Sequence, residues 1–261
     1  MTIPPLAAEP IAHLGSWPIT NAIINAWIAV FVFLVLGLLL RRRLQMVPRG
    51  AQNAVEAVTE FFLSTIQGVT RDHQRAQKFL PIVGTFFLFI LFSNWMGLLP
   101  GTGSIGIYQK VHGMVELVPL LRPAASDLNL TLALAVLGVL GANLFGIAAI
   151  GFFRHLNKFF PFGTMVTAFR KGGIHIFIGL VEFFVGVIEL ISEMAKMVSL
   201  SLRLFGNIFA GEVLLTVIAS LISVAVPLPF MGLEILVGAI QATVFSLLVL
   251  VYLTMATEKV H

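Results

Sequence analysis

The chain has 261 residues, of which 58% are hydrophobic and 11% are charged, and its mean hydropathy is +1.00. This balance indicates an integral membrane protein and excludes an ordinary soluble domain. The formal net charge of +4 comes from short basic blocks beside apolar segments, which is typical of orientation signals and not of a surface for nucleic acid. The absence of cysteine excludes disulfides, thiol catalysis and cysteine-based metal sites.

Apolar runs long enough to cross about 30 Å of hydrocarbon predict about five membrane helices and one amphipathic helix on the cytoplasmic side. In chain order, the predicted segments are an outer N-terminus (1–18), a first span (19–40), the amphipathic helix (51–72), a second span opening at Pro81 (81–99), an outer loop (100–128), a third span (129–153), a long helix (174–223) and a last helix (230–256). The amphipathic pattern fits a helix lying on the membrane or one packed against protein. The chain is therefore predicted to be a single all-α membrane domain.

Residues 174–223 are too many for one upright crossing. At about 1.5 Å per residue, about 50 helical residues extend about 75 Å, more than twice the hydrocarbon thickness. No proline and no polar turn interrupts this run before Pro227. One steeply tilted helix is expected, which the turn at Pro227 and Pro229 joins to the last helix as a long tilted hairpin.

Polar residues follow one stripe of this long helix. They are Glu182, Glu189, Glu193, Lys196, Arg203 and Asn207, at steps of seven, four, three, seven and four. An arginine at the bilayer centre costs from about 2.5 to about 17 kcal/mol, depending on the method. Arg203 should therefore have a partner or an aqueous cavity, although a static salt bridge to a glutamate of its own chain would also satisfy it.

The basic residues are distributed unequally along the predicted topology. With the N-terminus outside, the cytoplasmic set is Arg41, Arg42, Arg43, Arg49, Arg71, Arg75, Lys78, Arg154, Lys158, Arg170, Lys171 and Lys259. Only Lys110 and Arg122 fall outside, and this bias predicts a cytoplasmic C-terminus. Because the first basic residue is Arg41, no cleavable signal peptide is expected. A bacterial inner (plasma) membrane is favoured, and an organelle inner membrane is the alternative.

Three motifs together resemble subunit a of the F-type ATP synthase. They are the block from Leu202 to Glu212, the last-helix pattern with Gln241-Ala242 and Val251 to Ala256, and Ala125 to Asn129 before the third span. The resemblance follows nearly the whole chain in order, length and topology. It implies a stator subunit beside a rotating ring of subunit c, which conducts protons or sodium ions through two offset half-channels and so couples the ion gradient to ATP synthesis.

The family role also suits the residues. A ring carboxyl must be neutral while it faces lipid and must ionise at the stator, where a fixed cation stabilises it. The resemblance assigns this role to Arg203, which would also prevent the half-channels from joining into a leak. The implied partners are the c-ring, the peripheral-stalk subunit b and the lipid bilayer. No cofactor or metal is implied, and the lack of a Gly-rich phosphate loop predicts a non-catalytic subunit.

The resemblance selects further residues for ion translocation: Glu212, Glu234, Asn207, Gln241 and Glu189. We expect Glu212 and Glu234 to share an outer cavity and to pass a proton there, unless each is simply a water-exposed acid at a helix end. Asn207 and Gln241 would hold water, orient Arg203, or only hydrogen-bond to one another.

Residues nearer the two membrane surfaces carry open alternatives. Asp127 and Asn129 would form the outer entrance, or Asp127 would cap the third span. Glu193, Lys196 and Ser199 would continue the path on the cytoplasmic side, or Glu193 and Lys196 would merely pair at i,i+3. The six histidines show no ligand spacing and are expected at the surface or the interface.

Two other functions compete with this interpretation. A secondary ion transporter would use broken helices at a midplane site, commonly with an internal repeat, and no repeat is found. An intramembrane hydrolase would need a nucleophile with a base, paired aspartates or a metal motif. The only aspartates are Asp72 and Asp127, neither is expected at membrane depth, and the sequence has no His-Glu-x-x-His.

Overall fold

The structure is a computed structural model that describes residues 5–42, 45, 47, 49–99, 102, 105–111, 114–159, 174–221 and 226–258. It divides into two compact units, one of Met1–Thr131 with Leu202–Leu248 and one of Leu132–Ser201 with Val249–His261. Several predicted features lie outside the described residues: residues 1–4, residues 222 and 223 of the long helix, parts of the outer loop, and the basic residues Arg43, Arg170, Lys171 and Lys259.

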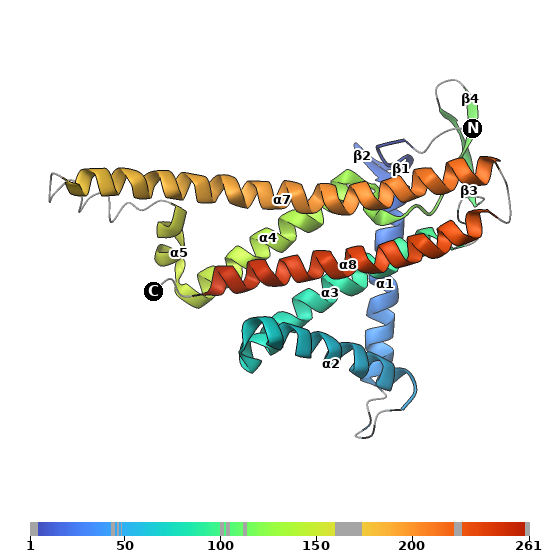
Figure 1. The fold of residues 1–261 in the computed structure, drawn as a ribbon. Coiled ribbons are helices and arrows are strands. Elements are labelled where there is room, and N and C mark those ends of the chain that lie inside the picture. Colours follow the sequence, from blue (N-terminus) through green and yellow to red (C-terminus); the bar gives the residue numbers. More distant parts are fainter. Residues whose placement is uncertain are drawn as a thin grey trace. The chain divides into compact units, whose positions relative to one another are not determined.

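Most of the described chain is helical (Figure 1). In chain order the elements are β1 (Pro10–Leu14), β2 (Trp17–Thr20), α1 (Asn21–Arg41), α2 (Ala51–Thr70), α3 (His73–Gly97), β3 (Gly106–Val111), β4 (Met114–Pro119), the 3₁₀ helix η2 (Ala124–Ser126), α4 (Leu128–Ile150), α5 (Phe152–Phe159), α7 (Ile174–Leu221) and α8 (Pro227–Thr257). In this part of the chain, α1, α3, α4, α7 and α8 are long and apolar enough to cross a membrane. The predicted class, an all-helical membrane protein, is confirmed.

Two β-hairpins accompany these helices and were not predicted. Strand β1 pairs antiparallel with β2, and β3 pairs antiparallel with β4. Their strands are four to six residues long and contain proline or glycine, so the apolar alternation that marks a strand is too short to recognise. Both hairpins lie in segments predicted to be outside the membrane, except that Ile19 and Thr20 of β2 fall within the predicted first span.

Buried asparagines tie the start of α1 to the segments around it. Thr20 caps the helix by accepting a hydrogen bond from the Ile23 N–H at 3.3 Å. The Asn25 side-chain amide donates to the carbonyl of Ser93 at 3.1 Å and to that of Arg122 at 2.6 Å. Because this amide group is buried, losing an acceptor would leave a polar group without solvent, and the two bonds therefore hold Ser93 of α3 and the backbone of Arg122 against α1.

The amphipathic helix α2 packs on α3 within the first unit. Phe62 and Ile66 are buried, and the ring of Phe62 lies 4.6 Å from that of Phe87, centroid to centroid. Val55 and Val69, which lie at helical spacing from these two residues, stay 49% and 44% exposed. The apolar face of α2 is therefore longer than its contact with α3, and Val55 and Val69 leave exposed apolar surface near its two ends.

Helix α3 starts earlier than the sequence pattern predicted. It begins at His73, after Asp72 accepts hydrogen bonds from the N–H groups of Gln74 and Arg75 at 2.9 and 3.4 Å. Pro81 lies inside the helix and does not open it. A proline removes one backbone donor, which membrane helices tolerate, whereas a capped start is favoured over an uncapped one.

The ends of the later helices also differ from the predicted ranges. Helix α4 ends at Ile150, before Gly151, whose φ of 97° is a conformation that favours glycine. Residues 152 and 153 belong instead to the short helix α5. Helix α7 is one uninterrupted element of 48 residues, and α8 begins at Pro227, where the missing N–H costs no helical bond.

The close approach of Gly97 to Pro123 gives a test of how α3 packs against the segment before η2. A Cβ at Gly97 would overlap the Pro123 ring and would lie 2.7 Å from its nitrogen. We expect Gly97→Ala to lower the free energy of unfolding by about 1–3 kcal/mol through overpacking. Gly84→Ala in the same helix is the matched control, because nothing lies within 4 Å of its added Cβ. Thermal unfolding in detergent micelles measures both, and equal Tm values would refute the contact.

Candidate functional site

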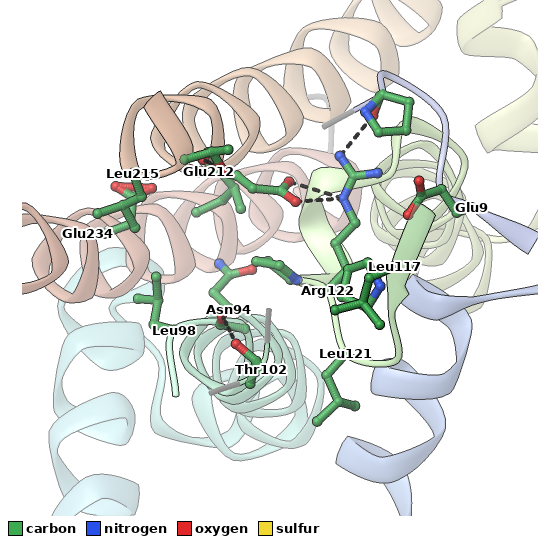
Figure 2. Close-up of a pocket in the computed structure, with 16 residues that line it drawn as sticks. Glu9, Asn94, Leu98, Thr102, Leu117, Leu121, Arg122, Glu212, Leu215 and Glu234 are labelled. Carbon is green, nitrogen blue, oxygen red and sulfur yellow. Dashed lines mark hydrogen bonds and ion pairs between the residues drawn. The ribbon is translucent and has the colours of Figure 1, made fainter. Parts of the chain in front are cut away.

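A cavity of about 340 Å³, with both polar and apolar walls, lies in the first unit (Figure 2). Its walls come from the N-terminal segment, α3, β4, the segment before η2, α7 and α8. The charged and amide side chains that line it are Glu9, Asn94, Arg122, Glu212 and Glu234. The cavity therefore collects three carboxyl groups around one guanidinium.

Arg122 and Glu212 form a buried ion pair across 90 residues of sequence. Nε of Arg122 donates to Oε1 and Oε2 of Glu212 at 2.9 and 3.0 Å, and the arginine side chain is 2% exposed. Its two terminal nitrogens donate to the backbone carbonyls of Pro5, at 2.9 Å, and Ala7, at 3.4 Å. Hydrogen bonds that involve a charged group are the strong ones, so this side chain links the N-terminal segment to α7.

Glu234 lies on the same cavity but is held differently. It is 7% exposed, and within the described part of the chain its Oε1 has no hydrogen-bond partner. Its carboxyl group lies so close to the backbone of α7 that a Cβ at Gly211 would overlap it. Glu212 and Glu234 thus line one cavity, but the Glu212 carboxylate is bound by Arg122, whereas that of Glu234 faces a bare stretch of helix.

Asn94 adds a second unsatisfied group to the cavity wall. It is 2% exposed, and neither Nδ2 nor Oδ1 has a partner among the residues that the structure describes. Buried polar groups of this kind are usually satisfied by water, and the cavity is large enough to hold several molecules. The cavity can therefore hold water beside its unsatisfied polar groups.

Arg203 lies on the part of α7 that belongs to the same unit. It is exposed, and it makes no ion pair with any residue in the described ranges. One turn further, the Asn207 Nδ2 donates to the Gln241 Oε1 at 2.7 Å, and Gln241 is 3% exposed. The static salt bridge to a glutamate of the same chain, considered from the sequence, does not occur in the described part.

The second unit holds a separate polar cluster. Glu193 accepts from the Lys196 Nζ at 2.8 Å and from the Asn143 Nδ2 at 3.2 Å. The His155 Nε2 lies 2.9 Å from the Asn143 Oδ1, and the Lys196 Nζ lies 5.5 Å from the ring centroid of Tyr252. These contacts join α4, α5, α7 and α8 around one neutralised charge pair.

His155 corrects an expectation, since the histidines were predicted at the surface or the interface. It is 5% exposed, and its ring lies over Gly146, where a Cβ would approach the Cε1 atom to 2.8 Å. His13, His73 and His175 are exposed, as expected, whereas His112 and His261 lie outside the described residues. The predicted third span ended at residue 153 and left His155 outside it, whereas α5 is a separate helix that brings the His155 ring against Gly146 of α4.

The remaining predicted residues are more dispersed. Asp127 is buried, and its Oδ1 accepts from the Asn129 N–H at 3.0 Å, which is a capping contact at the start of α4. Neither residue is among those that line the cavity. Glu189 is half-buried, and Ser199 is exposed. No group of three acidic or histidine side chains that could hold a metal ion occurs in the described residues.

Sequence reasoning missed four polar residues of these clusters: Asn94, Arg122, Asn143 and His155. Arg122 had a usable signal, because it is one of only two basic residues on the predicted outer side. Asn94 and Asn143 also had a signal, since each is an amide inside an apolar run. What the sequence could not supply was the partner of each group.

The Asn207–Gln241 hydrogen bond can be measured with a double-mutant cycle. We expect a coupling free energy of about 0.6 kcal/mol between Asn207→Ala and Gln241→Ala, the average for side-chain hydrogen bonds between membrane helices. Unfolding of the chain in mixed micelles by a denaturing detergent gives the four free energies. The same cycle on Asn207 and Thr85 of α3, which does not bond to it, is the control. Additive effects in the first cycle would show that the bond does not stabilise the fold.

Comparison with known proteins places the chain in a family. A family model described as ATP synthase A chain matches residues 23–254. The ATP synthase subunit a of Moorella thermoacetica is 32% identical over 243 residues, which cover 93% of this chain and 93% of that protein. The ATP synthase subunit a of Trichlorobacter lovleyi is 33% identical over 241 residues, with coverages of 92% and 89%.

A third relative extends the agreement. The ATP synthase subunit a of Mycobacterium ulcerans is 34% identical over 255 residues, which cover 94% of this chain and 92% of that protein. The family match takes in all or nearly all of the five candidate membrane spans. The chain therefore belongs to the ATP synthase A chain family, multi-pass membrane subunits of the F-type ATP synthase that serve ion translocation.

Proposed function

We propose that this chain conducts ions, most simply protons, through two offset half-channels at an interface with the rotating c-ring. In this proposal Arg203 stabilises the ionised carboxylate of each ring subunit as it arrives, and blocks a direct leak between the half-channels. The subunit itself performs no catalysis. Sodium is the alternative ion, because the choice depends on the binding site of the ring.

The observation that carries the proposal is the exposure of Arg203. A guanidinium stays charged when it is desolvated, so it cannot escape the cost of facing lipid by losing its proton. Within the described chain Arg203 has no carboxylate partner, and its neighbour Leu202 is 51% exposed. A charged group on an apolar surface calls for an anion from another protein, and the ring carboxylate is such an anion.

The surface around Arg203 also suits a second helix. Gly206 and Ala210 lie on the same exposed side of α7, and the space beside Gly206 is open. Small residues allow two helix backbones to approach closely in a membrane. The Asn207 and Gln241 side chains lie beside this strip and would order water or the guanidinium during the exchange.

The polar clusters supply candidates for the two half-channels. The cavity with Glu212, Glu234 and Asn94 would be the outer half-channel, with the exchange centred on the carboxyl groups. Glu189, Glu193, Lys196 and Ser199 would contribute on the cytoplasmic side, where Glu193 and Lys196 form a pair. Asp127 and Asn129 would support the outer entrance by fixing the start of α4.

The remaining parts of the proposal concern assembly and topology. The chain would contact the peripheral-stalk subunit b and the surrounding lipid in addition to the ring. The distribution of basic residues supports an N-terminus outside and a cytoplasmic C-terminus in a bacterial inner membrane. An organelle inner membrane would give the same pattern.

Removing the charge of Arg203 tests the central step. We expect Arg203→Ala to abolish ATP-driven acidification of inverted vesicles that contain the assembled complex, and to raise their passive proton conductance. Arg75→Ala is the matched control, because it removes the same group from a residue on the cytoplasmic side whose side chain is 42% exposed. Undiminished pumping by Arg203→Ala, at equal assembly, would refute the proposal.

The position of Glu234 can be tested without changing its charge. A Cβ at Gly211 would displace the Glu234 carboxyl, so we expect Gly211→Ala to slow pumping several-fold. Shortening the acid by one methylene should relieve the overlap, and Gly211→Ala with Glu234→Asp should pump at the rate of Glu234→Asp alone. If Gly211→Ala pumps at the wild-type rate, the contact between Glu234 and Gly211 has no part in transport.

A further inference from the structure

Arg122 makes more contacts than a counter-ion for Glu212 would need. Its Nε contacts both oxygens of that carboxylate, and its two terminal nitrogens are bound to backbone carbonyls of the N-terminal segment. Its Cζ atom also lies 6.0 Å from the centroid of the Phe209 ring on α7. Every side of the guanidinium is therefore directed to a fixed group.

The N-terminal segment that Arg122 binds is also part of the cavity wall. Pro5 accepts from the Arg122 Nη2 and lines the cavity, and Glu9 lines it as well. Figure 2 shows Arg122 between Glu212 on one side and Glu9 on the other. Residues 5–9 have no helix or strand of their own; the two bonds to Arg122 hold Pro5 and Ala7, and the Glu9 carbonyl accepts from the Asn21 N–H at 3.2 Å.

The ion pair also distinguishes the two glutamates on α7 and α8. Both oxygens of Glu212 face the Arg122 Nε, whereas Glu234 has an oxygen with no partner in the described chain. A carboxylate held by a guanidinium keeps its charge and its rotamer, since leaving would strand two buried charges. Glu234 is not restrained in this way.

We propose that Arg122 is a positioning residue that fixes Glu212 as a permanent anion and fastens residues 5–9 as a wall of the outer cavity. The proposal rests on the proposed function in assigning the cavity to the ion path. The inference goes beyond the proposed function because it gives the two glutamates different roles. Glu212 supplies a constant negative charge, and Glu234 is the carboxyl that exchanges the ion with the cavity.

The test uses thiol labelling, which needs no transport. Because the chain has no cysteine, Leu215→Cys would place its single thiol in the cavity wall. The assembled complex in detergent micelles is treated with a cationic or an anionic methanethiosulfonate, and labelling of this chain is followed by mass spectrometry. The labelling rate measures access to the cavity, and the ratio of the cationic to the anionic rate measures its charge.

Four variants in the Leu215→Cys chain separate the two parts of the proposal. Arg122→Gln should label several-fold faster than the parent and prefer the cationic reagent more strongly, because the wall is loosened and the Glu212 charge is uncovered. Arg122→Gln with Glu212→Gln should still label fast, but its charge preference should return to that of the parent. Glu212→Gln alone should keep the slow rate, because Arg122 can still bind the carbonyls of Pro5 and Ala7.

Arg122→Lys is the fourth variant and guards against failure of the others to fold. It keeps the positive charge but cannot reach two carbonyls and a carboxylate together, so it should label fast with an unchanged charge preference. Leu99→Cys, at an outer position that is 54% exposed, is the control thiol whose rate should not respond to any change at Arg122.

Failure of this proposal can be told apart from failure of the proposed function. The labelling rates test the role of Arg122, whereas ATP-driven pumping by the Arg203→Ala complex tests the proposed function. Unchanged labelling rates in both Arg122→Gln and Arg122→Lys would overturn the role of Arg122 in fastening the N-terminal segment. A charge preference that is the same with and without Glu212→Gln, in the Arg122→Gln background, would overturn the fixed anion.

Discussion

The pairing of Arg122 with Glu212 is the interaction on which the described cavity of the first unit depends. A charge that is removed from water must be matched by an opposite charge and by hydrogen bonds, or it destabilises the fold. Arg122 is 2% exposed and is matched in both ways, by Glu212 and by the carbonyls of Pro5 and Ala7. One side chain thus joins the N-terminal segment, the segment before η2 and α7, and all three contribute to the cavity wall.

Arg203 carries the same charge in an apolar environment, but it has no carboxylate partner in the described chain. Both arginines belong to a chain that is mostly apolar, yet the described residues supply a carboxylate for only one of them. An arginine that is satisfied within its own chain holds structure together, whereas one left unsatisfied on an apolar surface favours binding of an anionic partner. The two arginines therefore differ in whether the described chain supplies a carboxylate. In our proposal this difference, and no property of arginine itself, gives them different tasks.

The sequence predicted features that depend on local pattern, and it failed where a distant contact decides. The membrane class, the long helix α7 and the polar residues Glu212 and Glu234 follow from hydropathy, helical spacing and motif. The partner of Glu212 does not, because Arg122 lies 90 residues away and the segment before η2 has no periodicity to align it. His155 was placed at the surface for a similar reason, since its burial depends on how α5 folds onto Gly146 of α4. Pro81 misled the prediction because a capping aspartate upstream outweighed a helix-breaking tendency that membrane helices tolerate.

Three glycines reveal a common way of fitting polar or rigid groups into this apolar framework. Gly97 makes room for the Pro123 ring, Gly211 for the Glu234 carboxyl, and Gly146 for the His155 ring. A helix in lipid cannot open its backbone to accommodate such a group, because each freed amide would lose its hydrogen bond. It can instead omit a side chain, which brings the group against an intact helix at the cost of a lower helix propensity. The polar residues are therefore positioned by the absence of neighbouring side chains as much as by hydrogen bonds, and the glycines are as much a part of the site as the charged groups.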